Sequence, residues 1–325
     1  MKLANLYGFL KKDIEDIENR LTNTIEAEHP ILREASLQLL LAGGKRIRPV
    51  FVLLSAQFGN YKKNVEQVKA VAVALELIHM ATLVHDDVVD DAELRRGKPT
   101  IKHLYGNRVA MYTGDYILAR ALEVITTVDN PSVHRLLSKT LVKVVEGEIA
   151  QIEDKYNVDQ HLRDYLRRIK RKTASLIATS CKLGAISSGA SVKQANQLYR
   201  YGYNIGMSFQ IIDDILDFTA SSEELGKPTG SDLIQGNITL PVYYAMNDPS
   251  FLAELKRVFQ CKDKMSENQI QHLLNLLYQT DAIDQSYRLS NQYLQKALFS
   301  ISQLPNNRTK KTLQVIANII GKRRS

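Results

Sequence analysis

Two groups of three aspartates share the spacing Asp-Asp-x-x-Asp, and each follows a strongly apolar stretch of the chain. The first aspartate group is Asp86, Asp87 and Asp90, and the second aspartate group is Asp213, Asp214 and Asp217. On a helix, residues four apart project from one face, so we expect the outer carboxylates of each group to be neighbours. Like charges at this spacing destabilise a helix unless cations lie between them. Because hard divalent cations prefer oxygen ligands, the pattern predicts Mg2+ binding.

The repeat argues for a ligand that both groups share. A single acidic group at a helix end is most often a solvated surface, but two groups with the same spacing after apolar sequence are not typical of surface decoration. Mg2+ in proteins is held by a few carboxylates together with the phosphates of a substrate. Two facing groups therefore predict a pocket for several Mg2+ ions and a diphosphate. Asp91 lies outside the repeated spacing and is interpreted as a solvated neighbour.

Four further motifs accompany the two aspartate groups. They are Gly43-Gly44-Lys45-Arg46-Ile47-Arg48-Pro49, Arg95-Arg96-Gly97, Lys172-Thr173-Ala174 and Gly226-Lys227-Pro228. In this order, the set resembles the trans-isoprenyl diphosphate synthases, which join allylic diphosphates to isopentenyl diphosphate. The aspartate groups correspond to that family's two aspartate-rich motifs. The resemblance covers about residues 40 to 245, and the ordered set is far more specific than either aspartate group alone.

The whole chain is predicted to be helical. Apolar residues recur at spacings of three and four, and 8 prolines and 16 glycines are few for 325 residues. The pattern predicts helices over residues 65–91, 159–188 and 192–218, among others. No linker composition divides the chain, so we expect one domain over residues 1–325. The resemblance implies an all-α bundle of long helices around a central cavity, the isoprenoid synthase fold.

The resemblance also implies roles for individual side chains. All six aspartates are expected to bind Mg2+, with three ions per active site. Contacts with isopentenyl diphosphate are implied for Lys45, Arg48, His79 and Arg96, and contacts with the allylic diphosphate for Arg95, Lys172, Thr173 and Lys227. Gln210 lies three residues before Asp213, where its carbonyl oxygen is expected to stabilise developing positive charge. The candidate catalytic residues are thus Asp86, Asp87, Asp90, Lys172, Gln210, Asp213, Asp214 and Lys227.

Product length is predicted from the side chains that precede the first aspartate group. Short-chain relatives carry an aromatic residue there, whereas this chain has the small residues Ala81 and Thr82. Small side chains at these positions predict an open tube and a long product. Deeper residues, including Leu75 and Ile78, are expected to form a later floor of that tube.

A narrower resemblance concerns Gln235-Gly236-Asn237 and the overall sequence. These resemble the large subunit, component II, of bacterial hexaprenyl or heptaprenyl diphosphate synthases, which act with a small, dissimilar partner and make precursors of the menaquinone side chain. The resemblance implies a heterodimer with a small regulatory subunit, farnesyl diphosphate as primer and a hexaprenyl or heptaprenyl product. Asn237 stands where many relatives carry Lys, which leaves one phosphate contact open.

Three alternatives stay open at this point. The first is a homodimeric synthase of another chain length, which has the same motifs. The second is a terpene cyclase, which the homoallylic-site residues Lys45 and Arg48 and the pair Arg95-Arg96 disfavour. The third is a non-catalytic subunit that binds prenyl diphosphates, which two intact aspartate groups disfavour.

Composition limits the partners and the compartment. The net charge of +8 comes from 43 Lys and Arg against 35 Asp and Glu, and there is no Trp. Basic and aromatic residues do not alternate as in a nucleic-acid groove, so diphosphates and transient membrane contact during product release explain the charge better. The apolar run from Val71 to Val89 contains charged residues and is not predicted to span a membrane. Two cysteines and no apolar signal sequence predict a cytoplasmic protein.

Overall fold

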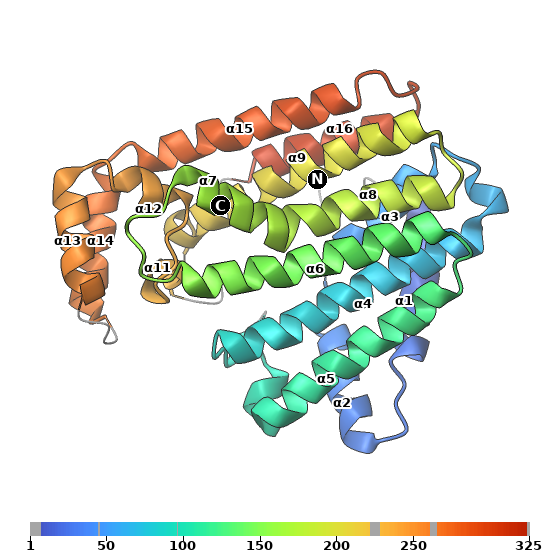
Figure 1. The fold of residues 1–325 in the computed structure, drawn as a ribbon, viewed down its shortest axis with the longest axis horizontal. Helices are drawn as coiled ribbons and strands as arrows, with labels where there is room; N and C mark the ends of the chain where they lie inside the picture. Colours follow the sequence, from blue (N-terminus) through green and yellow to red (C-terminus); the bar gives the residue numbers. More distant parts are fainter. Residues whose placement is uncertain (1–7, 45, 96, 222–227, 261–264, 324–325) are drawn as a thin grey trace. The chain divides into compact units, whose positions relative to one another are not determined.

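The computed structural model describes residues 8–44, 46–95, 97–221, 228–260 and 265–323, where nearly all regular structure is helical (Figure 1). The α-helices are α1 (Lys11–Thr24), α2 (Pro30–Leu41), α3 (Ile47–Ala56), α4 (Val65–Val89), α5 (Ile101–Thr126), α6 (Pro131–Glu153), α7 (Leu162–Ile169), α8 (Ser175–Ser187), α9 (Val192–Thr219), α11 (Ser231–Ile234), α12 (Leu240–Ala245), α13 (Pro249–Gln260), α14 (Glu267–Tyr278), α15 (Ala282–Ser300) and α16 (Arg308–Gly321). The short elements are the 3-10 turns η2 (Gly8–Leu10) and η3 (Tyr61–Lys63), the π-helical segment η4 (Lys170–Ala174), and the antiparallel strands β1 (Leu94–Arg95) and β2 (Lys98–Pro99). The predicted all-α class is confirmed.

The chain divides into two compact units. Unit 1 consists of Met1–Lys139, Ile177–Gly202 and Gln303–Val315, and unit 2 consists of Thr140–Leu176, Tyr203–Ser302 and Ile316–Ser325. The first aspartate group belongs to unit 1 and the second aspartate group to unit 2. The single domain over residues 1–325 stays a prediction.

Helix α4 is the core helix of unit 1. It is long and apolar enough to cross a membrane, but 72% of its most apolar window is buried inside the protein. A helix that is apolar on all sides and covered by protein is a core helix, which agrees with the sequence prediction. Helix α5 runs beside it (Figure 1). Gly114 of α5 permits this approach, because a Cβ there would lie 2.3 Å from Nε2 of His85.

Two apolar clusters build unit 2. One packs α7 against the second half of α9 through side chains such as Tyr165, Ile211 and Ile215. The other joins the end of α9 to the helices α11 to α14, with Phe218 and Phe251 among its fully buried members. The last turns of α9, which carry the second aspartate group, therefore lie in a dense core.

Three local features are not predicted by the apolar periodicity of the sequence. The predicted helix over residues 159–188 is interrupted by the π-helical segment η4, so α7 and α8 are separate elements. Helix α5 begins at Ile101 and departs from helical geometry at Gly106, with φ 80° and ψ 166°. A small hairpin, β1 and β2, follows the first aspartate group. Each feature depends on contacts or local strain that apolar periodicity does not encode.

Candidate active site

The first aspartate group lies at the carboxyl end of α4. Asp87 is 4% exposed, and its Oδ1 accepts from Nε and Nη2 of Arg95 in β1, each at 2.7 Å. Burial raises the pKa of Asp87, although the Arg95 guanidinium acts in the opposite direction. Asp86 and Asp90 are partly exposed, one turn apart, and the backbone N–H of Asp90 donates to the carbonyl of Asp86 at 2.8 Å. The hairpin thus brings a cation to the middle carboxylate.

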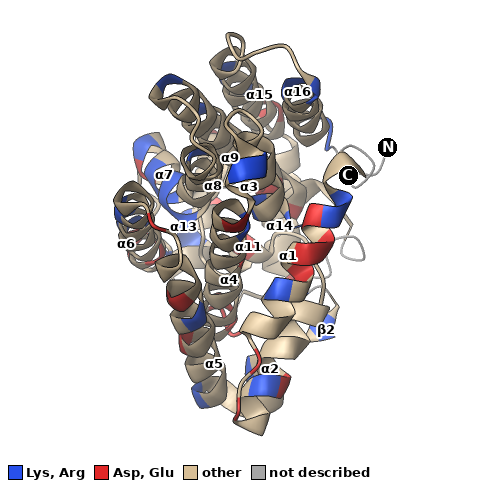
Figure 2. Cartoon of the chain, turned by 90° about the vertical axis from the view of Figure 1, so that its right-hand side faces the viewer, with Lys and Arg blue, Asp and Glu red and all other residues tan. Residues whose placement is uncertain are grey.

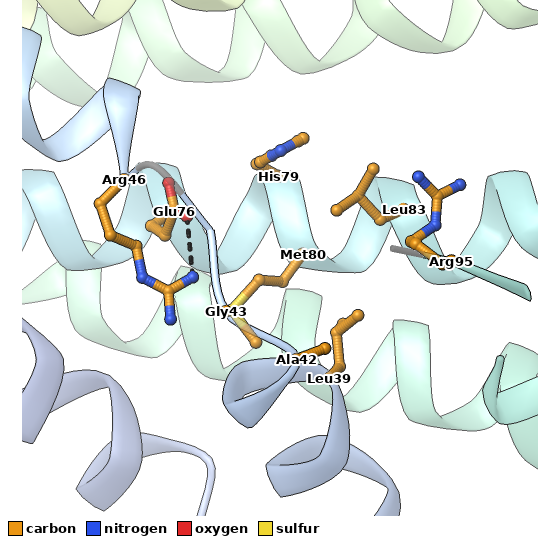
Figure 3. Close-up of a pocket in the computed structure, with 9 residues that line it drawn as sticks. All are labelled: Leu39, Ala42, Gly43, Arg46, Glu76, His79, Met80, Leu83 and Arg95. Carbon is orange, nitrogen blue, oxygen red and sulfur yellow. Dashed lines mark hydrogen bonds and ion pairs between the residues drawn. The ribbon is translucent and has the colours of Figure 1, made fainter. Parts of the chain in front are cut away.

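A pocket in unit 1 lies beside this group. It is lined by the end of α2, the turn before α3, the face of α4 and Arg95 (Figure 3). Two residues that the resemblance implies for substrate binding, His79 and Arg95, both line it. Its other walls are partly apolar, including Leu39, Met80 and Leu83. Arg46 and Glu76, which are paired with each other, also line it, so the pocket combines charged groups with apolar walls.

Not every implied substrate ligand lies in the part of the chain that is described. Lys45, Arg96 and Lys227 lie outside the described residues. Arg48 is partly buried in the first turn of α3. Between Lys45 and Arg48, Arg46 is buried and ion-paired with Glu18 and Glu76, an arrangement that the sequence did not indicate.

The chain-length candidates lie where α4 is most buried. Ile78 and Ala81 are 0% and 2% exposed, and Thr82 is partly buried. The Thr82 hydroxyl donates to the carbonyl of His79 at 2.8 Å, which satisfies its polar atom within the helix. These three positions therefore present small or apolar surface to the surrounding core.

The middle carboxylate of the second aspartate group is held by neutral donors. Asp214 is 4% exposed and accepts from the Tyr165 hydroxyl at 2.7 Å and from Nε2 of Gln210 at 2.8 Å. Burial raises the pKa of Asp214 to about 7, and the charge of Asp232 acts in the same direction, against these two hydrogen bonds. Gln210 continues the network, because its Oε1 accepts from the Thr173 hydroxyl at 2.6 Å.

The outer aspartates of the second aspartate group have different partners. Asp217 is 1% exposed and accepts from the Ser231 hydroxyl at 2.8 Å and from the backbone N–H of Asp232 at 3.1 Å. Asp213 is partly exposed and pairs with Nη1 of Arg323 at 2.9 Å. The Arg323 guanidinium also lies over the ring of Phe209, 5.2 Å from its centroid. Sequence reasoning did not connect Arg323 with Asp213, because 110 residues separate them.

Lys172 is held in the π-helical segment η4 against α6. Its Nζ donates to Oε2 of Glu148 at 2.8 Å, and the neighbouring Arg171 pairs with Glu146 at 3.3 Å. Gly147, between the two glutamates, permits this contact, because a Cβ there would lie 2.7 Å from Cβ of Arg171. π-Helical turns inside helices are rare and occur frequently at functional sites. The unusual turn therefore coincides with the motif that carries Lys172 and Thr173.

The donor chemistry of the aspartate groups fits Mg2+. Within the described residues, no group of three or more His, Cys, Asp or Glu side chains is arranged to enclose a metal ion. Mg2+ does not need such a cage, since it is normally bound by one or two carboxylates, waters and substrate phosphates. The partly exposed Asp86, Asp90 and Asp213 offer oxygen ligands of that kind.

Comparison with known proteins assigns the family. Residues 29–277 match the polyprenyl synthetase family. The chain belongs to this family. It is 56% identical over 324 residues to heptaprenyl diphosphate synthase component 2 of Bacillus subtilis (strain 168), which covers 100% of this chain and 92% of that protein. The family resemblance predicted from the motifs is confirmed, and the chain is a prenyltransferase.

Two solved structures of polyprenyl synthetases share the fold. Heptaprenyl diphosphate synthase from Staphylococcus aureus has a TM-score of 0.92 and 42% identity, covering 100% of this chain and 99% of that chain. Polyprenyl synthase from Caulobacter crescentus CB15, complexed with calcium and isoprenyl diphosphate, has a TM-score of 0.93 and 29% identity, covering 100% of this chain and 98% of that chain. The isoprenoid synthase fold is thus confirmed, and use of a divalent metal agrees with the family.

Proposed function

We propose that this polyprenyl synthetase is the catalytic subunit of a heptaprenyl diphosphate synthase. It condenses isopentenyl diphosphate repeatedly with an allylic primer, farnesyl diphosphate, to give an all-trans product for the menaquinone side chain. The observation that carries this proposal is the 56% identity, over the full chain, to heptaprenyl diphosphate synthase component 2. The Staphylococcus aureus heptaprenyl diphosphate synthase supports seven units over six. Together with the +8 net charge and the buried apolar helix α4, the family supports a cytoplasmic enzyme with transient membrane contact.

The proposed chemistry assigns a role to each motif. The two aspartate groups hold Mg2+, three ions per site, which supplies positive charge to the diphosphate of the allylic substrate. Lys172, Lys227 and Arg95 bind the same diphosphate and stabilise the negative charge that develops as its C–O bond breaks. Thr173 and Gln210 extend this binding surface, with a carbonyl oxygen of Gln210 facing the allylic cation.

The second substrate supplies the electrons of the new bond. Lys45, Arg48, His79 and Arg96 hold isopentenyl diphosphate so that its double bond attacks the allylic cation. One C–C bond forms, and a proton leaves the carbon next to the new cationic centre to give a trans double bond. The released diphosphate accepts that proton. The enzyme's own contribution is orientation and charge stabilisation, since none of these steps requires a side chain as general base.

Product length tests the proposed tube. Ala81→Phe places an aromatic ring one turn before the first aspartate group, at a buried position of α4. We expect it to shorten the product by one or more isoprene units, because the growing chain meets the ring. Thr82→Ala is the matched control, since it keeps a small side chain. Chromatography of the dephosphorylated products gives the answer, and an unchanged length in Ala81→Phe removes Ala81 from the floor.

A surface on α6 supports the proposed partner. Val142, Val145, Ile149 and Ile152 are 59%, 63%, 52% and 48% exposed, and they follow one another at spacings of three, four and three. Alternation of three and four is the spacing of a helix that packs against another helix. Since relatives of this chain are named component 2, we propose that this stripe binds a helix of the small regulatory subunit. Isolated exposed apolar residues are common, whereas a stripe of four on one helix supports an interaction surface.

One reconstitution distinguishes the candidate functions. The purified chain is assayed with farnesyl diphosphate, labelled isopentenyl diphosphate and Mg2+, alone and with the small subunit. We expect heptaprenyl diphosphate only from the mixture, and Ile149→Lys is expected to weaken the association, whereas Val192→Lys, at the 77% exposed start of α9, is not. Full activity of the chain alone favours the homodimeric alternative. A cyclic product, or binding without turnover, contradicts the proposal.

A further inference from the structure

Arg46 has a backbone conformation that is unusual for its residue type. It lies directly before α3, with φ 44° and ψ 41°, in the left-handed region. For a residue with a Cβ atom this region is strained, and such strain persists only where the surroundings enforce it. The turn that contains Arg46 also carries Lys45 and Arg48, the proposed ligands of isopentenyl diphosphate. The contacts of Arg46 therefore bear on the shape of a substrate-binding turn.

The Arg46 side chain is held from three helices. It is 8% exposed. Its Nε and Nη2 donate to the two carboxylate oxygens of Glu18 in α1, at 2.6 and 3.0 Å, which is a bidentate fork. Its Nη1 donates to Oε1 of Glu76 in α4 at 3.2 Å, as Figure 3 shows, and Nη2 also donates to the carbonyl of Leu40 at the end of α2 at 3.2 Å. A single guanidinium thus fixes the turn to α1, α2 and α4.

Arg46, the middle cation of this turn, has two carboxylate partners, Glu18 and Glu76. Three cations within four residues repel one another, and two carboxylates neutralise the one in the middle. Because its donors are directed to Glu18, Glu76 and Leu40, Arg46 serves the protein and not the substrate. Glu76 precedes His79 by three residues on α4, and both line the pocket of Figure 3. The Glu76 carboxylate therefore links the turn that contains Arg46 to the face of α4 that carries His79.

We propose that Arg46 is a positioning residue for isopentenyl diphosphate. The fork to Glu18 and the bond to Glu76 hold Arg46, and with it the start of α3, in the conformation in which Arg48 meets the diphosphate. This inference rests on the proposed function, since it takes Lys45 and Arg48 as ligands of that diphosphate. Arg46 itself does not contact the substrate, so its loss is expected to weaken binding of one substrate and not the chemical step.

The test uses two variants and one matched control. Arg46→Lys keeps the charge but loses the fork, and Glu18→Gln keeps the shape but loses one charge. Arg20→Met is the control, because Arg20 of α1 makes a similar fork with Glu66 of α4, at 2.9 and 3.1 Å, away from this turn. The full chain, with its small subunit, is used for steady-state kinetics. Calorimetry measures binding of isopentenyl diphosphate without the allylic substrate.

We expect the variants to weaken binding of isopentenyl diphosphate and to leave binding of farnesyl diphosphate nearly unchanged. For Arg46→Lys and Glu18→Gln we expect KM and Kd for isopentenyl diphosphate to rise about tenfold, with kcat and the KM for farnesyl diphosphate within about twofold. Arg20→Met is expected to lower the melting temperature without this difference between the two substrates. The inference is overturned if both variants lose thermal stability but keep the wild-type Kd for isopentenyl diphosphate. A wild-type protein that does not bind or consume isopentenyl diphosphate contradicts the proposed function instead.

Discussion

The two aspartate groups have the same spacing but different surroundings. In the first aspartate group, the middle carboxylate, Asp87, is buried against the cation of Arg95. In the second aspartate group, the corresponding Asp214 is buried against the neutral donors Tyr165 and Gln210. Burial raises the pKa of both carboxyls; the Arg95 cation acts against this at Asp87, whereas at Asp214 the charge of Asp232 adds to it and the pKa rises to about 7. Equal spacing therefore does not produce equal electrostatics.

The last position of each group differs in a second way. Asp90 is partly exposed at the very end of α4, while Asp217 is 1% exposed and fixes the segment that begins α11. The second aspartate group thus belongs to the folded core of unit 2 as well as to the site. Figure 2 shows that α1 and α7 carry several charged residues. Carboxylates on core helices need specific partners, whereas surface carboxylates do not.

The largest expected effect comes from the first position of each group. Asp86 and Asp213 are both partly exposed. We expect Asp86→Ala and Asp213→Ala each to lower turnover about 100-fold or more, because each removes an oxygen ligand of the proposed Mg2+. Incorporation of labelled isopentenyl diphosphate into product measures the turnover of each variant. Asp91→Asn is the control with near wild-type turnover, and a loss below tenfold in either alanine variant separates that aspartate from catalysis.

We expect alanine substitutions at Asp217 and Asp90, the last positions of the two groups, to differ in their effect on the stability of the protein. Asp217→Ala leaves the Ser231 hydroxyl and the Asp232 amide without their acceptor in a buried place. We expect it to lower the free energy of unfolding by about 2–3 kcal/mol. Asp90→Ala is expected to change it by less than about 0.5 kcal/mol, because Asp90 is at a partly exposed helix end. Urea unfolding of both proteins without Mg2+ makes the comparison, and equal losses contradict it.

Two helical glycines offer a further comparison. Gly→Ala within a helix normally stabilises it by about 0.5–1 kcal/mol. At Gly147 the new Cβ meets Cβ of Arg171 at 2.7 Å and the backbone N of Lys172 at 3.0 Å, so we expect a loss of about 1–3 kcal/mol. At Gly114 it meets the His85 ring, which is able to rotate, so the expected loss is smaller. Thermal unfolding of the Gly147→Ala and Gly114→Ala proteins compares the two losses of stability. A larger loss in Gly114→Ala contradicts the expected order.

The smallest effect is expected at Arg323, the partner of Asp213 in the second aspartate group. The pair between Arg323 and Asp213 is about one-third exposed on each side, so it is worth at most about 1 kcal/mol. Arg323→Gln removes this pair and is expected to improve the apparent affinity for Mg2+ by about two- to fivefold. Calorimetry with Mg2+ in the presence of inorganic diphosphate measures this affinity. An unchanged or weaker affinity shows that Arg323 does not compete with the metal.

Much of the fold followed from local patterns. The apolar run before the first aspartate group predicted a helix over residues 65–91, and α4 spans Val65–Val89. The second predicted helix, over residues 192–218, agrees with α9 to one residue. Both are long segments with strong apolar content, for which local sequence decides helix formation. The break at η4 was not predicted, because apolar periodicity does not encode the close approach of Arg171 and Lys172 to Gly147.

Part of the candidate site was also predicted from the sequence, and part of it was not. Motif spacing indicated the six aspartates, the family resemblance indicated His79 and Arg95, and the structure places His79 and Arg95 on one pocket. Lys45, Arg96 and Lys227 lie outside the described residues, and the roles of all these residues stay predictions. Tyr165 and Arg323 were missed, since nothing in their local sequence marks them as partners of an aspartate. Their contacts span 49 and 110 residues.

The sequence by itself determined the helical class, the two aspartate groups and the family, because these depend on residue type and on spacing along one helix. Tertiary structure alone decided which carboxylate is buried, which receives a cation and which receives a hydroxyl. The physical reason is that the cost of burying a charge depends on every group packed around it. Those groups come from distant parts of the chain, so identical motifs acquire different environments only once the chain has folded.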